Sequence, residues 1–340
     1  MGFYVGNLTR ETSTTTGTGD FTLAGAVSAK YTTLNSDIPL GFGFYGKIEH
    51  QSADEWEIGL YELTASSTLA RRFVIKSSNA NALVNFSAGT KHIFSDIPGA
   101  LVNQQIVAQG TQFVLPIVNA TTMNGPIAVT QTGTRTAAAI TTTNVHTGTP
   151  RSDVLVTTAA TTAVASSRAN NNHIFLSSVN YMGGFDCEFI FGGATGQSTP
   201  TKRLFGGITN STGTPTDVNP STLLNMIGFG YDSADSNLQF MSNDGTSTAT
   251  KVDCGANFVK PTTDRAKMYF CRLYAFPNSS RVGWWVQDIE TGNKASGVAT
   301  TDLPAANTLL SWRCIASVGG TSSVIGVADG GFMVRSPYLY

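Results

Sequence analysis

The sequence predicts an all-β protein, and three features of the chain support this fold class. Apolar and polar residues alternate with a period of two along many segments, which is the pattern of strands buried on one face. β-Branched and aromatic residues fill these segments, and Gly, Asn and Asp separate them. Apolar residues do not recur at the i, i+3, i+4 and i+7 spacing of an amphipathic helix over a convincing length.

The clearest predicted strand lies at residues 185–191. Its sequence is FDCEFIF, so four apolar residues share one face and Asp186 and Glu188 lie on the other. Two carboxylates at i and i+2 superficially resemble a glycosidase pair. Charges on a solvated strand face are much more common, and we interpret Asp186 and Glu188 in that way.

Two strand–turn–strand units follow in the same half of the chain. Residues 238–242 and 247–252 flank an Asn-Asp-Gly turn, and an Asp-Gly pair supplies the positive φ angles of a tight hairpin. Residues 282–286 and 294–300 flank the sequence Glu-Thr-Gly-Asn. Strands joined by short turns predict a β-sandwich or jelly roll for this half.

The chain divides by composition into three predicted parts. Residues 1–97 form a small β domain that ends at a Pro-Gly pair, with strands expected at residues 19–27, 41–49, 56–63, 70–76 and 91–94. Residues 98–147 form a connecting segment of low charge, and residues 148–340 form the sandwich. Because the connecting segment is rich in Val and Ile, we expect short intertwined strands that pack between chains rather than a flexible linker.

The predicted surface is polar but carries few charges. Asp, Glu, Lys and Arg make up only 13% of the chain, and hydroxyl and amide residues are abundant, which suits a permanent assembly. The net charge of -1 and the scattered basic residues predict no nucleic-acid partner. The sequence shows no transmembrane run and no signal peptide at its start, so we expect synthesis in a cytoplasm without membrane insertion.

The first part resembles a small domain that recurs in virion proteins of tailed phages. Residues 10–27, RETSTTTGTGDFTLAGAV, are similar to the opening of that domain. Its later landmarks are matched in order by WEIG at 56–59 with Tyr61, TLAR at 68–71, SSN at 77–79 and VNFSAGTK at 84–91. The resemblance implies that residues 1–97 attach the protein to a phage particle.

The third part resembles the lectin-like, concanavalin-like β-sandwich at the C-terminus of many phage fibre proteins. The matching landmarks are GTPR at 148–151, GGF at 183–185, IGFGYD at 227–232, DSNLQ at 235–239, NDGT at 243–246 and TTDLP at 300–304. The resemblance implies a virion protein: a homotrimeric tail or head fibre, anchored to other tail, baseplate or capsid proteins, whose tip contacts a host-surface glycan. A decoration protein without receptor binding and a polysaccharide depolymerase remain alternatives.

Two adjacent tryptophans are the first candidate contacts for a ligand. Trp284 and Trp285 are neighbours in one predicted strand, so they face opposite sides of the sheet. We expect one in the core and the other either packed on a neighbouring chain or stacked against a sugar. The interface interpretation is favoured, because aromatic residues are enriched at contacts between subunits.

The acidic segment at residues 231–237, YDSADSN, is the second candidate. Tyr231, Asp232, Asp235 and Asn237 offer side chains to a ligand, and their oxygens are of the kind that a hard cation such as calcium prefers. The spacing departs from the DxDxDG pattern, and Asp and Asn commonly cap turns with their own side chains. We therefore predict a structural turn and no metal site.

No motif indicates catalysis or a cofactor, so the chain is predicted not to be an enzyme. The four histidines lie far apart and outside any nucleophile or metal motif. They are His50, His92, His146 and His173. The four cysteines lack CxxC and zinc spacing, so buried thiols are expected, with a disulfide left open. They are Cys187, Cys254, Cys271 and Cys314.

Overall fold

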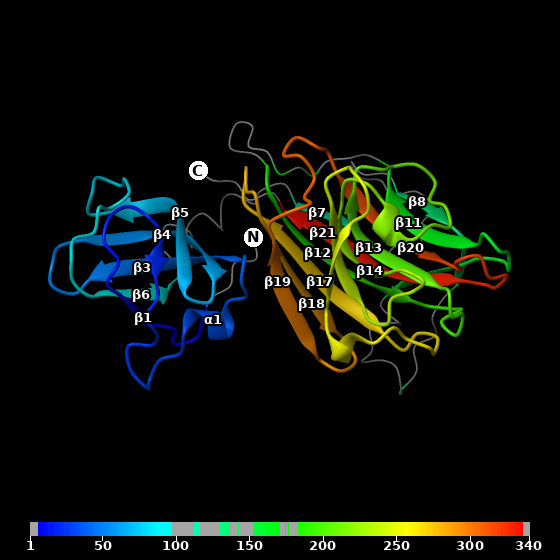
Figure 1. Cartoon of the computed structure of the whole chain (residues 1–340), viewed down its shortest axis with the longest axis horizontal. Helices are drawn as coiled ribbons and strands as arrows, with labels where there is room; N and C mark the ends of the chain where they lie inside the picture. The colour runs from blue at the N-terminus through cyan, green and yellow to red at the C-terminus, as the bar shows by residue number, and fades with distance from the viewer. Residues whose placement is uncertain are drawn as a thin grey trace. The chain divides into compact units, whose positions relative to one another are not determined.

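Figure 1 shows a computed structural model of the chain, in which residues 6–96, 112–115, 129–136, 142, 152–170, 174, 176 and 183–335 are described. These residues fall into two compact units, the first within residues 1–111 and the second within residues 112–338. Nearly all of their regular structure is strand, which confirms the predicted all-β class. Among the described residues, no helix is long and apolar enough to span a membrane.

The first unit contains a six-stranded antiparallel sheet with the order β1-β6-β3-β4-β5-β2. Its elements are β1 (Glu11–Ser13), β2 (Phe21–Thr22), helix α1 (Leu34–Asp37), β3 (Gly43–His50), β4 (Trp56–Ala65), β5 (Thr68–Ser77) and β6 (Lys91–Ser95). The last four expected strands correspond to β3, β4, β5 and β6.

The first expected strand of this unit, at residues 19–27, is mostly wrong. Only Phe21–Thr22 forms a ladder, with β5. Gly25 adopts a positive φ of 99°, which interrupts the extended backbone. The residues after it run beside β1 through separate bonds, such as the one from the Val27 N–H to the Arg10 carbonyl.

The second unit is a sandwich of two antiparallel sheets, which confirms the β-sandwich prediction. The eight-stranded sheet has the order β19-β18-β17-β12-β21-β10-β9, with β7 also paired to β21. Its strands are β7 (Gln112–Leu115), β9 (Thr134–Thr136), β10 (Asp153–Val156), β12 (Phe185–Gly193), β17 (Met268–Ala275), β18 (Val282–Asp288), β19 (Lys294–Ala299) and β21 (Gly326–Arg335).

The seven-stranded sheet has the order β16-β15-β14-β13-β20-β11-β8. Its strands are β8 (Val129–Thr132), β11 (Val164–Ala169), β13 (Arg203–Thr209), β14 (Met226–Tyr231), β15 (Gln239–Asn243), β16 (Thr250–Asp253) and β20 (Ser311–Ser317). Both sheets turn one face inward, and the side chains on these faces form one core.

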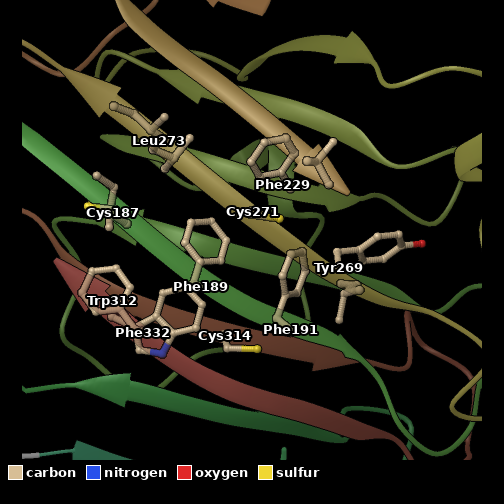
Figure 2. Close-up of a cluster of buried hydrophobic side chains, with 14 of the residues drawn as sticks. Cys187, Phe189, Phe191, Phe229, Tyr269, Cys271, Leu273, Trp312, Cys314 and Phe332 are labelled. Atoms are coloured by element: carbon tan, nitrogen blue, oxygen red, sulfur yellow. The ribbon is translucent and has the colours of Figure 1, made fainter. Parts of the chain in front are cut away.

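Aromatic side chains fill the centre of that core, as Figure 2 shows. The Phe189 ring lies 4.9 Å from that of Trp312, which in turn stacks on Phe332 at 5.0 Å. Phe189 comes from the inward face of β12 that the alternation in its sequence predicted. The four cysteines are free and buried, as expected.

The segment at residues 98–147 contributes strands to the second unit. β7 pairs with β21, β8 with β11 and β9 with β10, all within this chain. The rest of the segment lies largely outside the described residues. The predicted packing of this segment between chains, and the predicted boundaries at 97 and 147, therefore stay predictions.

Both predicted hairpins form, but the first has a longer loop than expected. Ser242 of β15 pairs with Thr250 of β16, so the second strand begins at residue 250 and not at the expected residue 247. Gly245 and Ser247 take the positive φ angles, 102° and 53°, while Asp244 does not. In the second hairpin, β18 and β19 pair as predicted.

Candidate functional site

The two adjacent tryptophans face opposite sides of the eight-stranded sheet, as predicted. Trp284 is 4% exposed and stacks on Phe240 in the core, with ring centroids 5.1 Å apart. Gly297 on the next strand leaves room for its indole, since a Cβ there would lie 2.5 Å from the ring. Trp285 is partly exposed on the outer face, edge-on to Phe270 at 5.5 Å. Of this pair, Trp285 is the residue that a surface ligand reaches.

The acidic segment forms the predicted structural turn. Asp235 accepts a hydrogen bond from the Asp232 N–H at 2.8 Å, and Asp232 accepts one from the Ser221 N–H at 3.0 Å. The Lys251 ammonium bridges the two carboxylates, at 3.2 Å from Asp232 and 2.6 Å from Asp235. In the part of the chain that the structure describes, no cluster of His, Cys, Asp or Glu is arranged to hold a metal ion.

The remaining two predicted site residues also make internal contacts. Tyr231 is buried, and its hydroxyl donates to Gln197 Oε1 at 3.1 Å. The Asn237 amide donates to both carboxylate oxygens of Asp253, at 3.1 and 3.0 Å. Because the tryptophans belong to the eight-stranded sheet and the acidic segment follows β14 of the other sheet, the predicted residues do not form one site.

The interpretation of Asp186 as a solvated charge is wrong. Asp186 is 2% exposed and receives two hydrogen bonds from the Arg272 guanidinium, at 2.8 and 2.9 Å. Glu188 lies 3.6 Å from the same guanidinium, and its side chain is 22% exposed. A shared arginine therefore explains the two neighbouring carboxylates, and they do not form the facing pair of a glycosidase.

The outer face of the seven-stranded sheet carries a feature that the sequence reasoning missed. The connection between β13 and β14, hereafter loop 210–225, is hydrogen-bonded to arginines from three strands of this sheet. Arg203 donates to the Asp217 carboxylate at 2.8 Å, and Arg168 donates to the Thr212 carbonyl at 3.1 Å. Arg313 donates to the Gly213 carbonyl. These bonds hold the loop against the sheet.

A hollow of about 130 Å³ lies between loop 210–225 and the sheet. Side chains of β13 and β20 line its floor, and hydroxyl residues of the loop line its exposed rim. The floor includes Arg203, Phe205, Arg313, Ile315 and Ser317, and the rim includes Ser211, Thr214 and Thr216. Guanidinium and hydroxyl groups around an apolar patch suit a small ligand that is rich in oxygen.

Two of the arginines beneath the loop form a pair of like charges. Arg168 and Arg313 lie directly opposite each other on β11 and β20, and they are only 7% and 2% exposed. Burial, and then the neighbouring Arg168, lower the pKa of Arg313 to about 10. Burial also lowers the pKa of Arg168. Like charges directly opposite each other destabilise a sheet unless other groups compensate them.

The loop satisfies only part of the hydrogen-bonding capacity of this pair. Nε of Arg313 and Nη1 of Arg168 are buried and have no acceptor among the described residues. A buried donor without an acceptor costs about 1–3 kcal/mol. The sequence signal for this site was weak: each arginine stands alone in a strand of apolar and hydroxyl residues.

The motifs of the first unit meet at a buried ion pair. Arg71 of β5 contacts both carboxylate oxygens of Glu57 on β4, and both side chains are buried. Arg71 also donates to the Gly17 carbonyl at 3.3 Å and the Val84 carbonyl at 2.9 Å. The Val84 N–H donates back to Glu57 at 3.2 Å. Four of the sequence motifs therefore converge on one network.

Aromatic rings of the same motifs enclose this ion pair. The Arg71 guanidinium lies 5.5 Å from the ring centroid of Phe21 and 5.3 Å from that of Phe86. The two rings contact each other edge-on at 5.4 Å. Cation–π contacts of this kind strengthen when they are desolvated. The motifs thus mark residues that build the interior of the first unit.

Comparison with known proteins finds similarity in structure only. No family model matches the chain, and no curated protein matches it. Similar solved structures include a peanut lectin bound to a nine-residue peptide (11% identity, TM-score 0.45, covering 68% of this chain and 100% of that one). Arcelin-5, a lectin-like defense protein from Phaseolus vulgaris, has 12% identity and a TM-score of 0.42, covering 68% and 100%. A legume lectin-like domain from Entamoeba histolytica has 8% identity and a TM-score of 0.40, covering 62% and 90%.

Proposed function

We propose that this chain is a non-enzymatic structural subunit of a tailed-phage particle, and that its second unit binds a saccharide on the host surface. The hollow beneath loop 210–225 is the observation that carries the binding part. Its hydroxyl rim and guanidinium floor match the hydroxyl groups of a sugar. Trp285, partly exposed on the other sheet, is a second candidate for contact with a sugar.

The first unit supports the attachment part of the proposal. Its sequence resembles the small domain of phage virion proteins over about ninety residues, and the matching motifs meet at the pair of Glu57 and Arg71. The resemblance therefore involves residues that determine the interior of the domain. We propose that this unit docks to a neighbouring tail, baseplate or capsid protein.

The particle would present several copies of the chain, and we propose a homotrimer. Repeated copies turn weak contacts with single sugars into strong adhesion, because the second binding event is intramolecular. Sedimentation of the full chain at micromolar concentration tests the trimer. A stable monomer under these conditions would contradict it.

Adhesion is tested with fluorescently labelled full-length protein and a panel of bacterial strains. We expect saturable binding to some strains, and loss of that binding after mild periodate oxidation of the cell surface, because periodate cleaves the vicinal diols of sugars. Trp285→Ala measures the contribution of the outer face of the eight-stranded sheet. Binding that survives periodate, or no binding to any strain, would contradict a saccharide receptor and favour a decoration protein.

The depolymerase alternative has a separate test. Arg272 pairs with Asp186 and lies close to Glu188, so the predicted strand carboxylates give it no support. Incubation of the protein with capsular polysaccharide from a bound strain should release no new reducing ends. Release of oligosaccharides would contradict the non-enzymatic proposal.

A further inference from the structure

We propose that the hollow beneath loop 210–225 binds an oxyanion, the carboxylate or the sulfate or phosphate ester of an acidic sugar, through the guanidinium of Arg313. This inference rests on the proposed saccharide binding and names the class of sugar. Arg313 is 2% exposed, lines the hollow, and has a buried Nε with no acceptor in the described chain. An oxyanion is the group that accepts hydrogen bonds from guanidinium most strongly.

The charges around the hollow favour an anion over a neutral ligand. Arg168, Arg203 and Arg313 bring three guanidinium groups to this face, and Asp217 is the only acidic residue in the sequence of loop 210–225. Asp217 is committed to Arg203 and to the N–H groups of Gly319 and Gly320, at 2.9 and 2.8 Å. Among the described residues, the opposed pair of Arg168 and Arg313 has carbonyl and hydroxyl acceptors from the loop.

A purely structural role for the two arginines accounts for only part of this arrangement. Arg168 and Arg313 do fix the loop, through the Thr212 and Gly213 carbonyls. One neutral side chain with an N–H group at each position would make the same bonds without placing like charges face to face. A ligand that carries a negative charge and enters the hollow would compensate the second charge.

The size of the hollow limits what enters it. About 130 Å³ is well below the ~300–1,000 Å³ of pockets for drug-sized ligands, so the hollow suits one sugar residue or its acidic group. The exposed hydroxyl groups of Ser211, Thr214 and Thr216 on the rim are placed to contact the rest of the sugar. We therefore expect one acidic residue of a longer saccharide to occupy the site.

Ligand-observed NMR with the full chain tests the inference. The probes are glucuronic acid, glucose 6-sulfate, glucose 6-phosphate, glucose and inorganic sulfate. We expect at least one of the acidic sugars to bind about tenfold or more tightly than glucose, because a charged hydrogen bond is lost with the neutral sugar. Comparison of the three acidic sugars identifies which oxyanion the site prefers.

Three variants control for folding and for location. Arg313→Met removes the proposed ligand contact. Thr216→Trp blocks the exposed rim and leaves all three arginines in place. It therefore tests whether the hollow is the binding site even if Arg313→Met fails to fold. Thr300→Trp makes the same substitution at an exposed position after β19, on the other sheet. We expect about a tenfold loss of acidic-sugar binding for the first two variants and no change for the third.

The results separate this inference from the proposed function. Equal binding of glucose and acidic sugars, binding unaffected by Thr216→Trp, or binding of inorganic sulfate alone would overturn the acidic-sugar site. If any of these results is found and the full chain still adheres to cells in a periodate-sensitive way, the proposed function stands without the acidic-sugar site. Acidic-sugar binding together with no adhesion to any strain would retain the site and overturn the adhesion.

Discussion

The two units treat buried arginines in opposite ways. In the first unit, Arg71 faces the carboxylate of Glu57, and both side chains are enclosed. In the second unit, Arg313 faces another guanidinium, that of Arg168, and its protein acceptor is the Gly213 carbonyl. The charge of Arg71 is compensated by Glu57, whereas Arg313 lies beside a hollow and is bonded, among the described residues, to a neutral carbonyl.

This difference separates a structural arginine from one that is available to a ligand. A buried ion pair whose donors are all satisfied holds the fold, and removal of either member leaves an uncompensated charge. A buried guanidinium that meets only neutral acceptors retains its charge and part of its hydrogen-bonding capacity for another molecule. Replacing arginines in each unit should therefore have unequal effects on stability.

The largest effect is expected from Arg71→Met. This change leaves Glu57 buried without its cation, and we expect the free energy of unfolding of the first unit to fall by about 3–5 kcal/mol. Hydrogen exchange of peptides within residues 6–96 across a urea series measures it unit by unit. Lys47→Met is the matched control, because Lys47 and Glu49 form a partly exposed pair at 3.3 Å that should contribute less than about 1 kcal/mol. Equal losses of stability for the two variants would contradict a structural role for the buried pair of Arg71 and Glu57.

A much smaller effect is expected from Arg313→Met. The variant loses the bond to the Gly213 carbonyl but also removes an unsatisfied donor and the repulsion from Arg168. We expect the free energy of unfolding of the second unit to change by less than about 1.5 kcal/mol, in either direction. Exchange in loop 210–225 should increase, because one of its anchors is gone. A loss as large as that at Arg71 would show that Arg313 is mainly structural.

Lys260, a buried lysine of the second unit, allows a test in which stability depends on pH. Its ammonium donates to the carbonyls of Asp232 and Ser233, both at 3.0 Å, and burial lowers its pKa to about 8. For Lys251, burial also acts to lower the pKa, but hydrogen bonds to Asp235 and Asp232 outweigh it and raise the pKa. Burial and then repulsion from Lys202 thus lower the pKa of Lys260, whereas direct hydrogen bonds to two carboxylates raise that of Lys251.

The direction of the pH effect follows from proton binding. Between pH 8 and the ordinary value of 10.5, the folded state has lost the Lys260 proton while the unfolded state retains it, so stability rises with pH in this window. Urea unfolding at pH 7.5 and 9.5 should show a gain of about 1 kcal/mol or less for the wild type relative to Lys260→Met. No difference between the two pH values would contradict the lowered pKa.

The smallest effect is expected at Glu11, a buried carboxylate of the first unit. Its carboxylate is buried and accepts a hydrogen bond from the Leu34 N–H at 2.8 Å, and burial raises its pKa. Because the ionised form is disfavoured in the folded state, stability is lost as the pH rises above 4.5. Glu11→Gln should therefore be slightly more stable than the wild type at pH 7, and this gain should shrink toward pH 4. A variant less stable at both pH values would show that the ionised carboxylate is required.

The local pattern of the sequence predicted the all-β class and fewer than half of the strands, and it predicted little of the site. Alternation placed Phe189 on an inward face and Trp284 and Trp285 on opposite faces, because side-chain direction in a strand depends only on position along it, but it did not tell which tryptophan is buried. The same rule could not tell that Arg272 would cover Asp186, since that contact joins strands far apart in the chain. A tight hairpin with residues 243–246 between its strands was expected from Asp244 and Gly245, but the pairing of the flanking strands sets a longer loop.

The candidate site was missed for the same physical reason. Arg168 and Arg313 come together only because β11 and β20 are neighbours in the folded sheet, and no local spacing indicates that pairing. The position of loop 210–225 over this face depends on hydrogen bonds to side chains of three strands. Long-range partners of this kind are outside the reach of periodicity and turn signals.

A crystal structure of the full chain soaked in sodium selenate tests most directly whether Arg313 is available to an anionic ligand. Selenate is an oxyanion that is located by its anomalous scattering. We expect an anomalous peak in the hollow, with an oxygen within about 3 Å of the Arg313 guanidinium, and no such peak in Thr216→Trp. We expect no selenate at Arg71, whose charge Glu57 already compensates. Selenate bound elsewhere on the surface while the hollow holds only water would contradict the claim that Arg313 is available to an anionic ligand.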